Sequence, residues 1–326
     1  MGIFNKNNGR IWPDLAFPHC AFYSRTGSQV ATKLLKSNVN DILVLIQLTG
    51  SYMDLEDPLV KRRETLNPYL YNGHAIVKRL LWDFNPLSWI SRRTLSKWKN
   101  KYQGENAIIL CNGPSLNKVD FNLISESDCF VFGLNKINLL FDRTDFRPNC
   151  IVAVNPFVIE QNKEFYNHTK IPLFLDAVGA CKMWISPRSN VCFLHSGGSS
   201  HSFAKDCSIS VNQGPTVTYV ALQLAFHMGF KHVALLGADH NFAVNGAANK
   251  TVNGDNRDES HFDPRYFANV EWQLPDLFES EVAYTRANIM YNAHDRKIFN
   301  CTVGGKLNVF NRMSLDEFLC GKGHRV

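Results

Sequence analysis

From Asn106 onward, short apolar runs alternate with polar or helical stretches. Each run is partly β-branched and is closed by turn-forming residues, which is typical of a buried strand. Buried strands separated by helical stretches indicate an α/β fold whose mostly parallel sheet carries helices on both faces. The expected strands are AIILC at 107–111, CFVFGLN at 129–135, CIVAVN at 150–155, IPLFL at 171–175, NVCFL at 190–194 and HVALLG at 232–237.

The clearest helical pattern covers residues 215–228. Its apolar residues recur at the spacing of a single helix face, and Gly229 is expected to end the helix before the next strand. The residues of this face are Val217, Val220, Ala221, Leu224, Ala225 and Met228.

Residues 1–103 form a separate N-terminal extension in this prediction, and residues 104–326 form the α/β domain. The extension contains one strand candidate, DILVLIQL at 41–48, and a partly helical segment at 80–102 that mixes aromatic and basic residues. Such a segment is typical of a packing helix with a solvated basic face, which we favour, or of a helix on an anionic membrane surface. Its basic residues are also compatible with an acidic acceptor.

Composition limits the class of protein. A chain of 326 residues with 45% hydrophobic residues can bury a large core, and it lacks the long apolar run of a membrane span or signal peptide. Its nine cysteines include no Cys-x-x-Cys pair, so we expect reduced thiols in the cytoplasm. The net charge of +6 is modest, and we expect no nucleic-acid partner.

Three expected strands end on an asparagine: Asn112, Asn135 and Asn155. In an open α/β sheet the ligand lies beyond the carboxyl ends of the strands. Amide side chains gathered there can bind a base edge, a ribose hydroxyl or a phosphate without adding charge.

The turn Asn-Gly-Pro-Ser follows the first of these strands. Gly113 lets the backbone approach a ligand, Pro114 presets the turn, and Ser115 is expected to cap a following helix. An ordinary tight turn without a ligand explains the tetrapeptide equally well.

The entry to the helix at 215–228 is a second candidate site. Gly214 and Thr216 lie where backbone N–H groups at a helix start favour an anion, and Thr218 adds a hydroxyl. The chain has neither the P-loop pattern nor G-x-G-x-x-G, so a standard kinase or dinucleotide fingerprint is not indicated.

The segment DNRDESHFDPRYF at 255–267 is predicted to be an exposed loop holding His261. This histidine is a candidate general base oriented by Asp263 or Glu259, although a single loop histidine is more often incidental. No zinc-ligand spacing is present. The carboxylates of this loop and Asp239 could hold Mg²⁺, but solvated loop carboxylates are the favoured interpretation.

Several motifs resemble a known family in their order. They are Ile109-Leu-Cys-Asn-Gly-Pro-Ser-Leu, Gly133-Leu-Asn, Val154-Asn-Pro, Gly214-Pro-Thr, Gly229-Phe, Leu236-Gly-Ala-Asp and Ser260-His-Phe. Over about residues 94–320 the chain resembles bacterial proteins with a 6-hydroxymethylpterin diphosphokinase MptE-like domain. It is also similar to their relatives, the motility accessory factor glycosyltransferases and the sialyltransferases of glycosyltransferase family 42.

The resemblance implies a single Rossmann-like nucleotide-binding sheet with a lid, a CMP-linked nonulosonic acid as donor, and inversion at the anomeric carbon. It implies that Asn112, Gly113, Asn135 and Asn155 contact the nucleotide and that His261 deprotonates the acceptor hydroxyl. Thr216 and its neighbours are implied to hold the donor near its phosphate. The remaining residues of the predicted donor site are Pro114, Ser115, Gly214, Thr218, Asp239 and His240.

Two departures from the sialyltransferases bear on the mechanism. Those enzymes place tyrosines that assist the departing phosphate where this chain has His240, Asn241 and Phe242. The Gly-Gly-Lys motif at 304–306 is predicted to form a hairpin in preference to a loop that closes over the donor.

The sequence therefore predicts a metal-independent glycosyltransferase that moves a CMP-activated acidic sugar to a glycan or protein acceptor and requires no cofactor. The alternative is a diphosphotransferase that acts on a pterin alcohol with ATP and Mg²⁺. A nucleotide-sensing or scaffold protein without activity ranks last. The expected location is the cytoplasm, with peripheral contact at the inner membrane as an open alternative.

Overall fold

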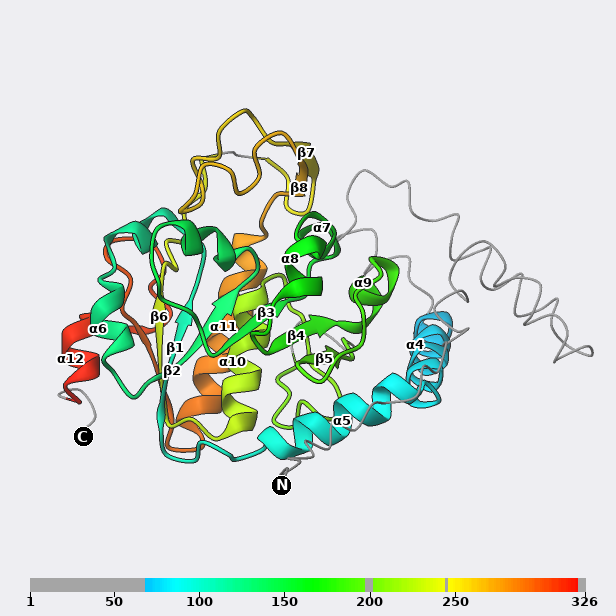
Figure 1. Cartoon of the computed structure of the whole chain (residues 1–326). Helices are drawn as coiled ribbons and strands as arrows, with labels where there is room; N and C mark the ends of the chain where they lie inside the picture. The colour runs from blue at the N-terminus through cyan, green and yellow to red at the C-terminus, as the bar shows by residue number, and fades with distance from the viewer. Residues whose placement is uncertain (1–67, 197–201, 244–245, 322–326) are drawn as a thin grey trace, which may run out of the picture. The chain divides into compact units, whose positions relative to one another are not determined.

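A computed structural model of the chain describes residues 68–196, 202–243 and 246–321, so the strand candidate at 41–48 lies outside the described residues. The described chain folds around an eight-stranded sheet in the order β10-β9-β6-β1-β2-β3-β4-β5, and every pairing in it is parallel (Figure 1). The prediction of a Rossmann-like α/β fold with a parallel sheet is confirmed.

All six predicted strands are present in the sheet. They are β1 (Asn106–Leu110), β2 (Phe130–Leu134), β3 (Cys150–Ala153), β4 (Leu173–Asp176), β5 (Val191–Leu194) and β6 (His232–Leu236). Two further strands were not predicted: β9 (Lys297–Asn300) and β10 (Asn311–Arg312). In register, Ile109 of β1 lies opposite Phe132 of β2 and Leu235 of β6.

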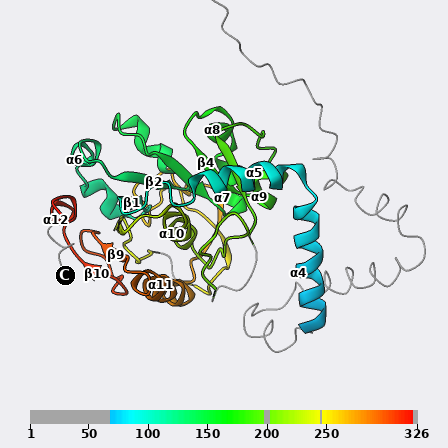
Figure 2. The same cartoon turned by 90° about the horizontal axis from the view of Figure 1, so that it is seen from below.

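Helices cover both faces of the sheet because side chains alternate between the faces along each strand. Ile109 packs into one core with residues of α10 (Val217–Met228) and α11 (Leu277–Asn292), which lie side by side (Figure 2). Its neighbours Ile108 and Leu110 pack into a second core on the opposite face. The other helices are α4 (Pro68–Asp83), α5 (Pro86–Trp98), α6 (Phe121–Ser125), α7 (Pro156–Gln161), α8 (Lys163–His168), α9 (Ala177–Lys182) and α12 (Leu315–Leu319), with 3-10 turns η2 (Pro114–Lys118) and η3 (Ile137–Asp142).

The predicted helix at 215–228 is α10, which begins two residues later than expected. All of its residues but the first are buried, because it lies between the sheet and α11. Gly229 ends it with φ 99°, a left-handed conformation that favours glycine.

The strand order reverses between β1 and β6. Strands β1 to β5 follow one another outward, and the chain then returns to place β6 on the other side of β1. A cap segment, residues 246–276, rises over this end of the sheet and contains the antiparallel pair β7 (Thr251–Asn253) and β8 (Glu271–Gln273) (Figure 1). Ligands of α/β sheets bind where the strand order reverses, which makes the space beneath the cap segment the candidate ligand site.

Helix α5 packs against the edge strand β5. Leu95 is buried in the core, and the backbone N–H of Phe193 on β5 donates to the Ser91 hydroxyl at 3.1 Å. The chain divides into compact units at 1–66 and 67–326, which places α5 with the sheet. The proposed boundary at 103/104 stays a prediction.

No helix among the described residues is both long and apolar enough to cross a bilayer. The eight described cysteines are free, and most are buried. Burial raises the pKa of the Cys111 and Cys192 thiols to about 12.

Candidate functional site

The turn that leaves β1 is joined to the turn that leaves β6. The backbone N–H of Gly113 donates to the Gly237 carbonyl at 2.9 Å. A Cβ on Gly113 would lie 2.0 Å from Oδ2 of Asp239, so this position requires glycine. The side-chain oxygen of Asn112 is buried and has no hydrogen-bond partner among the described residues. A buried acceptor without a donor is costly, which makes this oxygen a candidate for binding a ligand N–H or O–H.

Ser115 does not cap a helix, contrary to the prediction. Pro114 opens the 3-10 turn η2, whose N-cap residue Gly113 supplies no side chain. The Ser115 hydroxyl instead donates to Oδ2 of Asp239 at 2.7 Å. Ser115 makes this hydrogen bond instead of a helix cap because the close approach of the β1 and β6 turns places the Asp239 carboxylate beside it. Ser115 and Asp239 thus hold the two turns together.

His261 belongs to a segment that contacts the β1 turn. The next residue, Phe262, donates its backbone N–H to the Asn112 carbonyl at 2.9 Å, which anchors the cap segment on this turn. The His261 side chain is only 10% exposed, so it is not an exposed loop residue as predicted. The aromatic side chains of the cap segment bury it.

Asp258 orients His261, and neither Asp263 nor Glu259 does so as predicted. Nδ1 of His261 lies 2.7 Å from Oδ2 of Asp258. Asp263 is instead bound by Arg265 and Arg143, and Glu259 is exposed. Burial raises the pKa of Asp258, but the hydrogen bond and charge of His261, together with the backbone N–H groups of Ser260 and Phe267, offset this, and the net pKa is lowered.

An ionised Asp258 can only accept a hydrogen bond, so Nδ1 of His261 carries the proton. In the neutral ring Nε2 then has a free lone pair. No described residue forms a hydrogen bond to Nε2 in the structure. This tautomer is the one that a general base requires.

Aromatic rings fix the plane of the His261 ring. Tyr266 stacks on it with 4.1 Å between ring centroids and an interplanar angle of 3°. Phe267, Trp272 and Phe242 contact it at 5.0, 6.1 and 5.9 Å, nearly edge to face. The orientation of the imidazole is therefore set by packing as well as by Asp258.

Lys136, which follows β2, is a site residue that the sequence analysis missed. Its Nζ donates to the Tyr266 carbonyl at 2.5 Å and lies over the rings of Tyr266 and Phe267. Burial lowers the pKa of Lys136 to about 8, while the Asp258 carboxylate opposes this shift. The sequence offered one indication of its role, because Lys136 directly follows Asn135, the asparagine at the end of a predicted strand.

Asn135 and Asn155 differ in what their side chains do. Asn135 has φ 51°, and its side chain lies against the buried hydroxyl of Tyr266, whose pKa is raised by burial and lowered in part by Asn135. Oδ1 of Asn155 accepts the backbone N–H of Phe157 at 2.9 Å and so caps α7. Asn135 thus lies beside Tyr266, the ring that stacks on His261, whereas the Asn155 oxygen caps its own helix.

The start of α10 lies beside the end of β1. Thr218 places its hydroxyl 3.6 Å from Sγ of Cys111. Thr216 is the N-cap of α10, and its hydroxyl accepts the backbone N–H of Thr218 at 3.3 Å and lies 3.4 Å from the Tyr284 hydroxyl. Gly214, with φ 55°, turns the chain into the helix. The residue that precedes Asn112 therefore contacts the first turn of α10.

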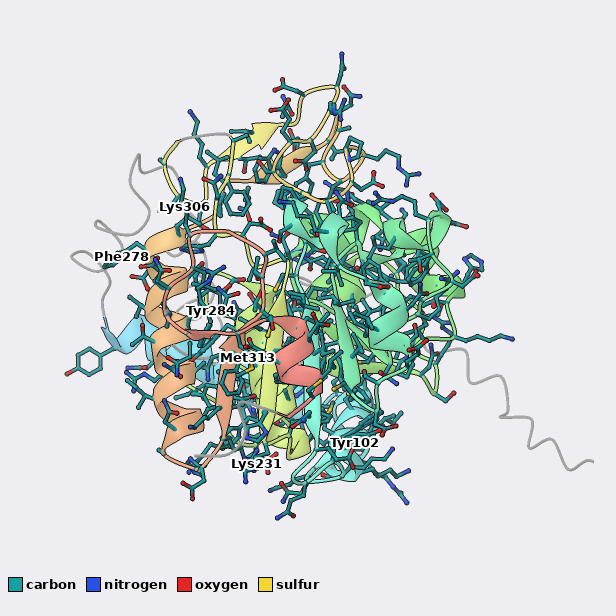
Figure 3. All side chains as sticks on the ribbon, turned by 90° about the vertical axis from the view of Figure 1, so that its left-hand side faces the viewer. Tyr102, Lys231, Phe278, Tyr284, Lys306 and Met313 are labelled. Carbon is teal, nitrogen blue, oxygen red and sulfur yellow. The ribbon has the colours of Figure 1, made fainter. Side chains whose placement is uncertain are left out.

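A cavity of about 200 Å³ opens next to His240. His240 has φ 51°, and its Nε2 lies 3.1 Å from Oε1 of Glu281; burial lowers its pKa and Glu281 opposes the shift. Lys306 lines the same cavity, near the amino end of α11 that Phe278 marks (Figure 3). The cavity is also lined by Asn241, Phe242, Gly246, Leu274, Pro275 and Leu277.

The Gly-Gly-Lys motif does not form the predicted hairpin. It lies in the connection between β9 and β10, and these two strands pair in parallel, which a tight hairpin cannot produce. The connection instead packs on the β6 turn: the Lys306 N–H donates to the Asp239 carbonyl at 2.8 Å, and a Cβ on Gly305 would lie 2.9 Å from that oxygen.

Asp176, at the end of β4, is a second residue that the sequence analysis missed. Its Oδ1 accepts hydrogen bonds from Ser196 at 2.5 Å and Gln213 at 3.1 Å, and its Oδ2 accepts the Gly179 N–H. Burial raises the pKa of Asp176. Its position after the apolar run IPLFL was the only signal.

The described residues contain no group of three or more His, Cys, Asp or Glu side chains placed to hold a metal ion. Three of the carboxylates considered for Mg²⁺ are bound to separate partners, Asp239 to Ser115, Asp258 to His261 and Asp263 to Arg265, and the fourth, Asp255, is exposed.

Comparison with known proteins identifies the class of domain. Residues 85–245 match the family described as 6-hydroxymethylpterin diphosphokinase MptE-like. This match confirms the resemblance inferred from the motifs. No curated protein is significantly similar to the chain in sequence.

The solved structures that are similar to the chain include two transferases. One is a Maf glycosyltransferase from Magnetospirillum magneticum AMB-1, with a TM-score of 0.42 and 16% identity; the match covers 76% of this chain and 42% of that one. The other is the sialyltransferase CstII from Campylobacter jejuni in complex with a substrate analogue, cytidine-5'-monophosphate. Its TM-score is 0.40 and its identity 15%, and the match covers 65% of this chain and 86% of that one. The chain thus spans less than half the length of the Maf enzyme.

Proposed function

We propose that the protein is a glycosyltransferase that moves a CMP-activated acidic sugar, a nonulosonic acid, to a hydroxyl of a glycan or protein acceptor. One observation carries the proposal: His261, oriented by Asp258 through Nδ1, belongs to a segment that contacts the β1 turn, whose Asn112 oxygen is buried and unpartnered. A base and a vacant acceptor for a ligand donor therefore stand at the switch point of the sheet.

In this mechanism Nε2 of His261 removes the proton of the acceptor hydroxyl as that oxygen attacks the anomeric carbon. The CMP phosphate leaves from the opposite face, so the configuration inverts. The backbone N–H groups at the start of α10 stabilise the departing phosphate, since a helix N-terminus favours an anion. The reaction in this form requires no metal ion and no covalent intermediate.

Asn112 binds the nucleotide in this proposal, because its buried oxygen accepts one hydrogen bond from a cytosine amino or ribose hydroxyl group. We place the acidic sugar toward the cavity beside His240, where the exposed Lys306 ammonium can pair with a carboxylate. His240 then takes the position of the leaving-group tyrosines of the sialyltransferases.

A CMP titration followed by thermal unfolding tests the donor. We expect CMP at millimolar concentration to raise the melting temperature without added metal, because binding to the folded state alone stabilises it. The absence of any shift would contradict a CMP-linked donor.

Substitution of His261 tests the base. His261→Ala is expected to reduce transfer by roughly 10²–10⁴-fold while leaving the CMP-induced shift nearly intact, because a general base acts on the acceptor. His168→Ala is the control, since this histidine is exposed on α8. An equal loss of CMP binding in His261→Ala would refute the assigned role.

The diphosphotransferase remains the second candidate because the matching family is described by that activity. It predicts stabilisation by ATP only in the presence of Mg²⁺ and no response to CMP. The separation of the carboxylates of Asp239, Asp258 and Asp263 among different partners favours the glycosyltransferase.

A further inference from the structure

Large apolar side chains are exposed along α4 and the start of α5. On α4 they recur at positions 76 and 80 and at positions 77 and 81, the spacing of neighbours on one helix face, and Phe84 follows directly after the helix. Their exposed fractions are between 48% and 76%. This apolar ridge consists of Ile76, Val77, Leu80, Leu81, Phe84, Trp89 and Ile90.

These two helices and the three residues after α5 hold the excess charge of the protein. Residues 68–101 contain seven of its 35 Lys and Arg residues but only one of its 29 Asp and Glu residues. The rest of the chain is therefore balanced, and the net charge of +6 lies wholly in this segment. Its single carboxylate, Asp83, is bound by Arg79 and Arg92.

Several of these cations remain available. Lys78, Arg93 and Lys97 are exposed and form no ion pair within the described residues, and Lys101 contacts only the rings of Trp98 and Tyr102. Lys99 differs, because it pairs with Asp206. The apolar ridge is thus accompanied by uncompensated positive charge.

We propose that the apolar ridge and the basic residues of α4 and α5 dock the protein on an anionic lipid bilayer. Exposed apolar residues insert between lipid headgroups, and Lys and Arg side chains beside them bind anionic headgroups. A protein partner could cover the ridge alone, but a net charge that lies wholly in residues 68–101 matches a surface of uniform negative charge. The bilayer would hold the site close to lipid-borne acceptors.

Sedimentation of the full chain with lipid vesicles tests the surface. We expect binding to vesicles of phosphatidylcholine mixed with phosphatidylglycerol, little binding to phosphatidylcholine alone, and a loss of binding as salt is added. No binding to the anionic vesicles would overturn the proposal.

Charge variants give the size of the effect. Arg93→Gln, Lys97→Gln and Lys101→Gln together are expected to weaken binding about 100-fold, at roughly five-fold per residue. The matched control carries Lys163→Gln, Lys182→Gln and Lys250→Gln, three exposed lysines elsewhere on the chain. Equal losses in the two triple variants would mean that only total charge matters, and the proposal would fail.

Substitutions in the apolar ridge distinguish a lipid bilayer from a protein segment as the surface that covers the ridge. Leu81→Ser, Phe84→Ser and Trp89→Ser together are expected to abolish vesicle binding at an unchanged melting temperature. Phe278→Ser and Ile289→Ser on α11 should leave binding intact, although both residues are exposed. If the ridge variant bound vesicles normally and changed only the mass by light scattering or the melting temperature, a second copy or another chain segment would cover the ridge, and the proposal would be wrong.

Discussion

At the scale of single residues, the sequence singled out Asn112 and His261, whose segments contact each other, but not the partners of His261. Asn112 could be chosen because it ends an apolar run, and His261 because histidine titrates near neutrality. The partner Asp258 was missed, since several acidic residues lie near His261 and only the folded loop selects one. Lys136 was missed because lysine is rarely buried, and its carbonyl and ring partners come from a distant segment.

The buried lysine predicts a pH dependence of stability. Folded Lys136 loses its proton at a pKa of about 8, whereas the unfolded lysine keeps it to about 10.5. Between these values the unfolded state binds more protons, so the free energy of unfolding rises with pH. We expect Lys136→Met to remove about 3 kcal/mol of this rise, measured by urea unfolding from pH 7.5 to 10.5.

Other groups titrate over the same interval, so the comparison is between variants. Lys250→Met, at an exposed lysine, should keep the profile of the unmodified protein. Parallel profiles for Lys136→Met and the unmodified protein would show that Lys136 is not perturbed.

At the scale of elements, prediction succeeded where burial is uniform. The six predicted strands are continuous apolar runs because both faces of a parallel sheet are covered. Helix α11 was missed, since its buried face consists of Ser280, Ala283, Tyr284, Ala287 and Tyr291 and lacks large aliphatic residues. Strand β10 has two residues and shows no period at all.

The end of α10 offers a test of backbone constraint. Gly229→Ala would place a Cβ in a left-handed conformation and 3.0 Å from the Cα of Gln103. We expect a loss of about 2–4 kcal/mol in urea unfolding, from strain and overpacking together. Gly304→Ala is the control: φ is 78° but no atom lies within 4 Å, so only about 1 kcal/mol is expected. Equal losses would show that the contact with Gln103 contributes nothing.

At the scale of the whole molecule, alternation along the strands predicts two cores, one on each face of the sheet. The described residues of both cores lie between Trp82 and Phe318. The number of strands in the sheet and their parallel order follow from long-range pairing, such as that of β6 with β9, which no local pattern specifies. The role of residues 1–66 stays outside what the pattern predicts.

Removal of residues 1–66 tests whether residues 67–326 fold independently. Because residues 67–326 form a compact unit of their own, we expect this remaining chain to unfold cooperatively with a melting temperature within about 4 °C of the full protein, a change of less than 1 kcal/mol. Circular dichroism melts of the two proteins measure this. A chain that aggregates or melts without cooperativity would contradict the expectation.

The hydrogen bond from Phe193 to Ser91 has a consequence for self-association. It occupies a backbone donor on the outer side of β5, and α5 covers that border of the sheet. At the opposite border β10 offers only two residues. Neither border of the described sheet therefore offers a second molecule a long open strand on which to add its own, which protects this highly apolar parallel sheet from growing into fibrils.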